Sequence, residues 1–403
     1  MSGKDRSLVR SVLRKATDPI YDLKRWARLR TASAWRRRFT NTVFVGITGS
    51  HGKTTATELL SQMLATMGPT HAGILRNIPK SVARGVIRAR PQHYRYFVQE
   101  VSGHAPGAME KSVGVIQPIV GVVTAVGGDH RKAFAGSWEA TAAEKAKLVH
   151  SLPADGLAVL NADDPLVAAM ADRCRCRVVT YGRTEGADLR LLTASSTWPS
   201  RLAFELAYRG DRFMVKSRLV GVHWTLSIQA ALLAALELGT ERSACLDVIA
   251  SFEPLFNRMS VHAAPNGAWY ILDADKASFF GVEACLGFLE EASAPRKTVV
   301  FGQISDHPGD SRSQYYKVAR MALARADRVF FTGVHAARVR RLATGEFAGR
   351  LFFDEQPEKV LAHLSGDAMD GEIVYIKASN ATGLQPIFVP KHKPGSSHVS
   401  SVL

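Results

Sequence analysis

The sequence has few cysteines. Only four occur in 403 residues, at positions Cys174, Cys176, Cys245 and Cys285. Their spacing fits neither a zinc site nor a disulfide framework, and Cys174 and Cys176 lack the two-residue gap of a redox or metal motif. We interpret all four as reduced thiols, which fits a protein of the cytoplasm.

Long apolar runs are absent as well. Residues 113–126 come closest, but Gln117, Pro118 and Gly121 interrupt them, and roughly 20 apolar residues are needed to cross a bilayer. Charges recur throughout the first 40 residues, which excludes an ordinary signal peptide. We therefore expect a cytoplasmic protein.

Acidic residues are scarce near the N-terminus. Residues 1–42 carry twelve Lys or Arg against three Asp, which is +9 of the chain's net +16. The remaining sequence has little interleaving of aromatic and basic residues, so nucleic acid is not the expected partner of the whole fold. Apolar residues at helical spacing, on both sides of Pro19, predict two short basic helices. They would pack on the next domain, or bind an anionic membrane surface or an acidic partner protein.

The length predicts roughly two to three folding units. From residue 42 onward, short β-branched runs alternate with helical segments, which is typical of βαβ units and a mainly parallel sheet. The strand candidates are residues 43–47, 96–100, 119–126, 157–161, 270–273, 298–301, 328–332 and 372–376. We predict an α/β fold with a basic helical extension (1–42), a central domain (43–257), a second domain (258–390) and a flexible tail (391–403).

A glycine-rich stretch at residues 46–55 lies between the strand candidate at 43–47 and a helical run at 56–67. Its glycines let backbone N–H groups turn toward phosphate oxygens, while the helix dipole and Lys53 add positive charge. Thr54 is placed to bind Mg²⁺ through its hydroxyl. The stretch departs from the strict P-loop pattern, because Ile47 stands where that pattern has glycine. We predict a nucleotide-phosphate site formed by Gly49, Ser50, His51, Gly52, Lys53, Thr54 and Thr55.

The order Thr-Gly-x-x-Gly-Lys-Thr-Thr at residues 48–55 resembles the phosphate loop of the Mur ligase family, and the resemblance continues over residues 44–379. Residues 98–103 resemble the family strand that ends in a magnesium-binding Glu, here Glu100. Residues 124–148 are similar to the block that holds a metal- and phosphate-side His, here His130. The same block has a lysine that many members carbamoylate, which would be Lys145, with Lys147 left open.

Later blocks resemble the nucleotide-binding parts of the family. Residues 159–165 are similar to its Asn-x-Asp-Asp turn, with Asn161 on the adenine side. Residues 256–259 resemble its interdomain hinge, with Arg258 as the hinge Arg. Residues 272–277 resemble a strand end whose Asp binds ATP, which would be Asp273 with Asp275 left open. Residues 377–379 are similar to the closing Lys-Gly-Ser.

The sequence departs from the family in three places. The classical muramyl ligases begin with a substrate domain that holds a UDP-sugar, and the first 42 residues, predicted as two basic helices, do not resemble it. Trp224 and Ser227 replace both Asn residues of the family's Gly-x-His-Asn-x-x-Asn helix start. Residues 301–306 differ from the segment on the amine-substrate side. From the first departure we expect either a substrate that carries no UDP group or a partner protein that supplies its recognition. From the third we expect recognition of the amine substrate to differ.

The resemblance implies a P-loop domain and a Rossmann-like C-terminal domain that use ATP and Mg²⁺. The enzyme would phosphorylate the carboxylate of a small molecule or peptide and join it to an amine, releasing ADP and phosphate. Such chemistry brings a carboxylate against a triphosphate, so cations must neutralise the site. Lys53, His130 and Lys145 would be catalytic, and Thr54, Glu100 and His130 would hold the metal.

Within the family, the blocks resemble the D-Ala-D-Ala-adding muramyl ligase most, with cyanophycin-type and poly-γ-glutamate-type polymer ligases as rivals. Cell-wall precursor synthesis is thus one expectation, and amino-acid polymer synthesis is another. Two further hypotheses stay open. One is a P-loop ATPase or binding module whose N-terminal helices engage nucleic acid or an anionic membrane. The other is a degenerate ligase that acts as a partner subunit.

Overall fold

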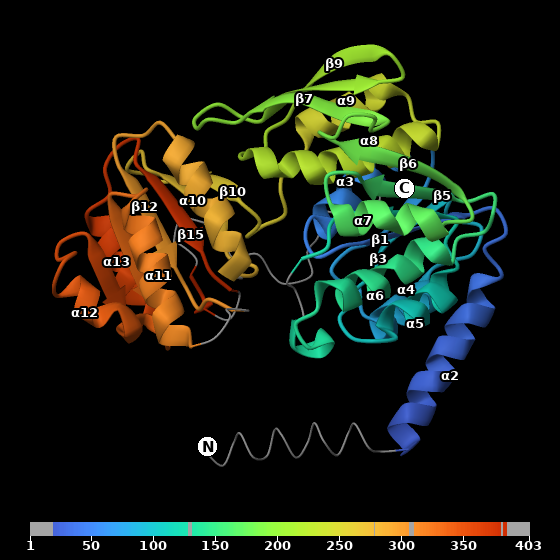
Figure 1. The fold of residues 1–403 in the computed structure, drawn as a ribbon, viewed down its shortest axis with the longest axis horizontal. Coiled ribbons are helices and arrows are strands. Elements are labelled where there is room, and N and C mark those ends of the chain that lie inside the picture. Colours follow the sequence, from blue (N-terminus) through green and yellow to red (C-terminus); the bar gives the residue numbers. More distant parts are fainter. Residues whose placement is uncertain (1–18, 128–130, 278, 306–309, 380–381, 385–403) are drawn as a thin grey trace. The chain divides into compact units, whose positions relative to one another are not determined.

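The computed structural model describes residues 19–127, 131–277, 279–305, 310–379 and 382–384. These residues form two compact units (Figure 1). The first holds the described residues up to Thr193 together with Phe204–Val215 and Trp224–Ala250. The second holds Ala194–Ala203, Lys216–His223 and the described residues from Ser251 onward. The predicted domain boundaries near residues 42, 257 and 390 stay predictions.

The first sheet has nine strands in the order β2-β3-β1-β4-β5-β6-β7-β8-β9. From β2 to β7 all neighbouring strands are parallel. In the register, Ile47 lies opposite Glu100 and Thr48 lies opposite Val123. The residues that follow β1, β3 and β4 therefore leave the sheet at one edge. The strands are β1 Val43–Thr48, β2 Thr70–Gly73, β3 Tyr96–Glu100, β4 Val120–Val123, β5 Leu157–Asn161, β6 Arg177–Gly182, β7 Leu189–Ser195, β8 Ala203–Tyr208 and β9 Asp211–Lys216.

Helices pack on this sheet because its strands are apolar on both faces. The central strands β1, β3, β4 and β5 are buried almost throughout. Phe44 and Phe97 stack with ring centroids 4.5 Å apart, and Phe39 contacts Phe44 edge-on. The helices are α2 Pro19–Arg36, α3 Lys53–Ala65, α4 Pro79–Arg88, α5 Ala108–Ile116, α6 Trp138–His150, α7 Pro165–Ala168, α8 Thr225–Glu237 and α9 Arg242–Ser251. Short 3₁₀ turns are η1 Arg131–Phe134, η2 Ala169–Arg173 and η3 Val222–Trp224.

The second sheet has six strands in the order β10-β11-β15-β12-β13-β14. Only β10 and β11 pair in antiparallel fashion, and the other pairs are parallel. Asp273 lies opposite Lys377, which in turn lies opposite Phe301. The strands are β10 Ser260–Ala263, β11 Trp269–Asp273, β12 Lys297–Phe301, β13 Arg328–Thr332, β14 Leu351–Asp354 and β15 Ile373–Lys377. The helices are α10 Val282–Glu291, α11 Ser311–Leu323, α12 Arg340–Ala343 and α13 Pro357–Gly366, with 3₁₀ turns η4 Phe279–Gly281 and η5 Ala336–Val339.

A buried ionic network lies at the N-terminal ends of strands in the second sheet, whereas Asp273 and Lys377 lie at the C-terminal ends. Glu372, which is fully buried, accepts hydrogen bonds from Arg296 (2.6 Å), Arg328 (2.7 Å) and the Thr298 hydroxyl (2.5 Å). Burial opposes ionisation of Glu372, but these hydrogen bonds outweigh it and lower its pKa. The network ties the N-terminal ends of β12, β13 and β15 together.

The predicted fold class is confirmed, because both units are α/β with mostly parallel sheets. Of the two predicted N-terminal helices, the second is α2, which begins at Pro19; the first lies outside the described residues. The tail at 391–403 also lies outside them. In the described part of the chain, no helix combines the length and the apolar character needed to span a bilayer. All four cysteines are free thiols.

Candidate active site

The loop between β1 and α3 has the backbone of an anion-binding turn. Gly49 (φ 147°) and Gly52 (φ 80°) adopt conformations that favour glycine. A Cβ at residue 49 would lie 1.9 Å from the Thr124 hydroxyl, so no larger residue fits there. Gly52 leads directly into Lys53, the first residue of α3, and no side chain caps this helix end. The first turn of α3 is therefore suited to phosphate oxygens.

Lys53 folds back over this loop. Its ammonium group donates hydrogen bonds to the carbonyl oxygens of Gly49 (2.5 Å) and Ser50 (3.2 Å). The positive charge therefore lies directly at the turn that would hold the phosphates, and phosphate binding by Lys53 stays a prediction.

The end of β4 fastens the loop from the other side. The Ser50 N–H donates to the Ala125 carbonyl (2.7 Å), and the Gly127 N–H donates to the Ser50 hydroxyl (2.7 Å). The Thr124 hydroxyl donates to the His51 carbonyl (2.5 Å). These bonds fix the loop conformation before any ligand binds.

Ser227 contacts the same loop from α8. Its hydroxyl donates to the Gly52 carbonyl (3.2 Å), and a Cβ on Gly52 would lie 2.9 Å from that hydroxyl. The position where the family has a second Asn thus holds a short side chain that supports the phosphate loop. Sequence reasoning did not predict this contact, because only the fold brings α8 against α3.

Glu100 lies at the end of β3 and is 2% exposed. Its carboxylate accepts hydrogen bonds from the Thr54 hydroxyl (3.1 Å), the Leu75 N–H (3.1 Å) and the Asn77 side-chain amide (2.7 Å). Thr54 and Glu100, predicted from separate motifs, are therefore in direct contact. Hydroxyl and carboxylate oxygens are donors that Mg²⁺ prefers, so this pair fits a magnesium ion.

Asn77 and Gln99 support Glu100, and sequence reasoning missed both. The Gln99 amide donates to the carbonyl oxygens of Gly73 (3.0 Å) and Arg76 (3.2 Å), which holds the loop at residues 73–77 against β3. No spacing marks these amides in the sequence. Among the described residues, no three His, Cys, Asp or Glu side chains form a group that could hold a metal. His130, the third predicted metal residue, lies outside the described residues.

Lys145 and Lys147 lie on α6 in different surroundings. Lys145 is 1% exposed, and a Cβ on Gly103, three residues after Glu100, would lie 3.5 Å from the Lys145 Cγ. Lys147 is 42% exposed and pairs with Glu144 (2.8 Å). This pairing raises the pKa of Lys147, so its ammonium group stays charged. The burial favours Lys145 as the residue that faces the loop after Glu100.

Asn161 is buried at the end of β5. Its amide N–H donates to the Thr124 carbonyl (2.9 Å), and its amide oxygen accepts from the Asp163 N–H (3.0 Å). It thereby joins the end of β4 to the turn after β5. A direct contact between Asn161 and adenine stays a prediction.

Arg258 and Asp273 lie in the second unit, with different partners. Asp273 accepts hydrogen bonds from Lys377 and from the Tyr375 hydroxyl (3.1 Å). Arg258 pairs with Asp275 (2.7 Å). Two carboxylates were left open for ATP binding. Asp273 is held at the strand ends by Lys377 and Tyr375, and Asp275 is held by Arg258, the predicted hinge Arg.

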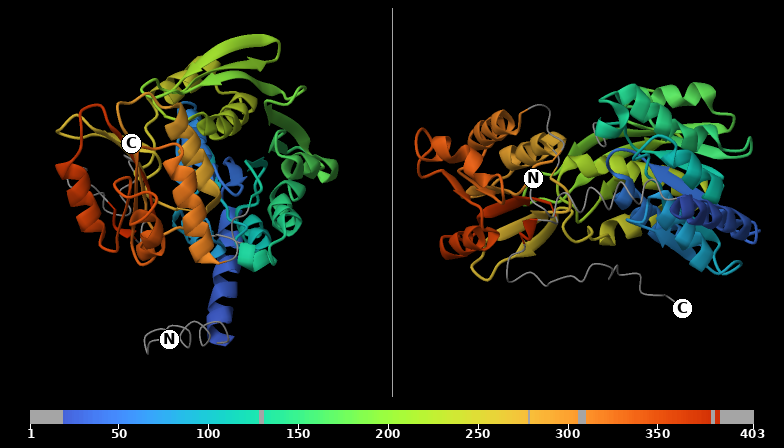
Figure 2. Two further views of the ribbon diagram at one scale, coloured as in Figure 1. Left: turned by 60° about the vertical axis from the view of Figure 1, so that its left-hand side comes forward. Right: turned by 90° about the horizontal axis from the view of Figure 1, so that it is seen from below.

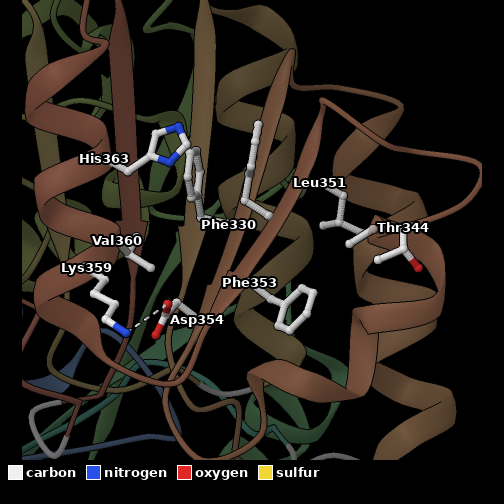
Figure 3. A pocket seen from close by; sticks show the side chains of 10 residues that line it. Phe330, Thr344, Leu351, Phe353, Asp354, Lys359, Val360 and His363 are labelled. Atoms are coloured by element: carbon white, nitrogen blue, oxygen red, sulfur yellow. Dashed lines mark ion pairs between the residues drawn. The ribbon is translucent and has the colours of Figure 1, made fainter.

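A hollow of about 340 Å³ lies elsewhere, at the β14 edge of the second sheet. Its wall includes Phe330 and Phe352, which stack 4.7 Å apart, and His363, whose ring lies 5.2 Å from that of Phe330. Figure 3 shows Lys359 and Asp354 at its rim. None of the predicted site residues lines it.

Two family models match the chain. The Mur ligase middle domain matches residues 47–235, which include the phosphate loop and Glu100. The Mur ligase, glutamate ligase domain matches residues 257–380, which include Asp273 and Lys377. The chain belongs to the Mur ligase family. It is accordingly an ATP-dependent acid–amino-acid ligase, as the sequence motifs predicted.

Several relatives of this Mur ligase are muramyl enzymes. A UDP-N-acetylmuramoyl-tripeptide D-alanyl-D-alanine ligase of Mycobacterium tuberculosis (strain CDC 1551 / Oshkosh) is 29% identical over 388 residues, covering 89% of this chain and 74% of the relative. A UDP-N-acetylmuramate L-alanine ligase of Dichelobacter nodosus (strain VCS1703A) is 30% identical over 219 residues, covering 54% of this chain and 44% of that one.

Solved structures of the family have the same fold as this Mur ligase. MurF from Acinetobacter baumannii has a TM-score of 0.79 at 20% identity, over 89% of this chain and 78% of that one. The MurF ligase of Thermotoga maritima in complex with ADP has a TM-score of 0.74 at 21% identity, over 88% and 81%. At these identities the likeness concerns the fold.

Proposed function

We propose that this Mur ligase uses ATP and Mg²⁺ to convert a substrate carboxylate into an acyl phosphate, which an amine then attacks. ADP and inorganic phosphate leave. The observation that carries the proposal is the contact between Thr54 and Glu100 beside a loop suited to phosphate. An acyl phosphate forms only where a carboxylate and a triphosphate can approach, and this arrangement would gather the cations they require.

Each part of the loop has a role in this proposal. Backbone N–H groups of residues 49–55 bind the β- and γ-phosphates, and the Lys53 ammonium turns from the loop carbonyls to the phosphate oxygens. The Thr54 hydroxyl and the Glu100 carboxylate would hold Mg²⁺, with His130 as a further ligand. When bound, Mg²⁺ would draw negative charge from the transferred phosphoryl group.

Lys145 would act as a carbamate. Carbamoylation converts a buried ammonium, which is costly away from water, into an anionic oxygen ligand for a second hard cation. The position of Lys145 beside Gly103 supports this role over Lys147. Asn161 would line the adenine side, and Arg258 and Asp273 would bind nucleotide from the C-terminal domain.

We propose a muramyl tripeptide as the carboxylate substrate and D-alanyl-D-alanine as the amine. The names of relatives that align with 89% of this chain support that choice. Poly-γ-glutamate-type and cyanophycin-type substrates are the alternatives. Because ATP and nucleotide-linked precursors are cytoplasmic, we also propose a cytoplasmic location, with residues 1–42 as a contact to a membrane or partner.

The test is phosphate release by the purified full-length chain, with each substrate omitted in turn. ADP and phosphate should appear only when the acyl substrate is present, and hydroxylamine in place of the amine should yield a hydroxamate. Acidic peptides replace the UDP-linked tripeptide in a parallel series to separate the substrate classes. Formation of AMP and pyrophosphate would refute the proposed chemistry.

A further inference from the structure

The C-terminal half of α2 is rigidly attached to the first unit. The Arg36 guanidinium donates to the carbonyl oxygens of Ile116 (2.6 Å) and Gln117 (3.2 Å) and lies over the ring of Phe44. The Ser33 hydroxyl donates to the Gly114 carbonyl (2.8 Å). The helix therefore holds a fixed direction, and both figures show its N-terminal half extending beyond α4 and α5 (Figures 1 and 2).

The outward face of α2 combines large apolar side chains with cations. Leu23 is 62% exposed and Trp26 is 56% exposed. The Arg30 guanidinium lies 5.1 Å from the centre of the Trp26 ring. At 100° per residue these three side chains lie on the side of the helix away from the buried Ala32. Two large apolar groups are thus kept in water at the end of a rigid helix.

Helix α4 adds a second basic face beside α2, against which it packs. Lys80, Arg84 and Arg88 are exposed and follow one another at intervals of four, so they lie along one side of α4. Its opposite side is buried through Val82 and Val86. Residues 22–38 and 79–95 together contain twelve Lys or Arg and one acidic residue, Asp22. The fold therefore joins two basic segments that are far apart in the sequence.

We propose that the exposed faces of α2 and α4, here called the α2–α4 surface, bind an anionic lipid bilayer. The cations would contact lipid phosphates, and Trp26 and Leu23 would enter the headgroup region, where Trp is favoured. Phosphates of a nucleic acid would also attract these cations, but they give no reason for exposing Leu23 and Trp26. The apolar pair therefore favours lipid. A single helix of this kind attaches a protein reversibly.

The test uses the full-length chain and sedimentation with two kinds of vesicle, phosphatidylcholine alone and phosphatidylcholine mixed with phosphatidylglycerol. Binding should require phosphatidylglycerol and should weaken as salt is added. The double variant Arg84→Glu/Arg88→Glu should bind at least about tenfold more weakly, since each basic residue near the surface contributes roughly fivefold. The matched control Arg173→Glu/Arg175→Glu changes the charge equally at exposed sites elsewhere in the first unit and should bind as the parent does.

The variant Leu23→Ala/Trp26→Ala separates lipid from nucleic acid. Its vesicle binding should weaken at least about tenfold, because two large apolar side chains no longer enter the headgroup region. Any binding to a duplex oligonucleotide should stay unchanged. Thermal midpoints near that of the parent would show that the variants fold. Equal binding to both vesicles, a control that loses as much binding as the α4 variant, or a Leu23→Ala/Trp26→Ala variant that binds vesicles as the parent does would each overturn the proposal.

Discussion

Lys145 and Lys147 are two residues apart, yet only Lys145 is buried beside the loop that follows Glu100. We expect Lys145→Arg to lower kcat at least about 100-fold, because a guanidinium cannot form the carbamate and would place a fixed cation in the site. Lys147→Arg keeps the charge opposite Glu144 and should stay within about threefold of the parent. Steady-state phosphate release measures both. Equal losses would contradict the assignment.

Adding a single methyl group at Gly49 tests whether the loop binds phosphate. A methyl group at this position would lie 1.9 Å from the Thr124 hydroxyl, with φ in a region that L-residues rarely adopt. We expect Gly49→Ala to weaken ATP binding at least about tenfold, measured by calorimetry, because the loop must shift. Gly107→Ala is the control, since Gly107 also has a positive φ but nothing within 4 Å of an added Cβ. It should cost about 1 kcal/mol of stability and leave ATP affinity unchanged. An unaffected Gly49→Ala would contradict the loop assignment.

Some individual residues of the site could be predicted from the sequence. The Gly-Lys-Thr order and the strand ending in Glu100 each indicated one residue of a proposed magnesium site, and parallel pairing of β1 with β3 brings these two residues into contact. Metal binding by the pair stays a prediction. Asn77 and Gln99 could not be predicted. Their contacts depend on how the loop after β2 passes β3, and amide side chains in loops follow no fixed spacing.

At the scale of elements, buried parallel strands were easier to predict than the others. The predicted strands at 96–100, 157–161 and 328–332 coincide with β3, β5 and β13. These are continuous apolar runs, as expected for strands covered on both faces. The prediction at 119–126 was too long, because the chain leaves the sheet after Val123 to hold the phosphate loop.

Other strands were missed for physical reasons. Strand β2 has only four residues, and β14 begins directly after a turn. Strands β7 to β9, at one end of the sheet, alternate between buried and more exposed residues, so one face of each is less covered. Such short or alternating runs resemble loops in a single sequence. The order of strands in either sheet could not be predicted from the pattern alone.

The ionic network around Glu372 gives a prediction for the second sheet. We expect Glu372→Gln to lower the unfolding free energy by about 3–5 kcal/mol, because Arg296 and Arg328 would lose their buried counter-charge. Glu290→Gln is the control; Glu290 pairs with Arg325 but is 60% exposed, and should cost at most about 1 kcal/mol. Urea unfolding at neutral pH measures both variants.

The same network predicts a direction for the pH dependence. The folded-state pKa of Glu372 is lowered, so its contribution is present above the unfolded pKa of about 4.3 and is lost as the pH falls through the folded value. The difference in stability between parent and Glu372→Gln should therefore shrink on acidification. A difference that stays constant down to pH about 3 would show that the pairing does not depend on ionisation.

At the scale of the whole molecule, the proposed function depends on one chemical event, the transfer of a phosphoryl group from ATP to a carboxylate. Both units carry residues that match a family of acid–amino-acid ligases, from the phosphate loop to Lys377. The transferred phosphoryl group gains one oxygen before it leaves as phosphate. In an ATPase that only hydrolyses nucleotide, this oxygen comes from water. A ligase of this family would take it from the acyl substrate.

The most direct measurement labels that oxygen. The full-length chain is supplied with ATP, Mg²⁺, D-alanyl-D-alanine and a muramyl tripeptide whose terminal carboxylate carries ¹⁸O, and the released phosphate is analysed by mass spectrometry. The account predicts ADP and phosphate that contains one ¹⁸O atom, together with an amide product. Unlabelled phosphate accompanying the amide, or AMP with pyrophosphate, would contradict it.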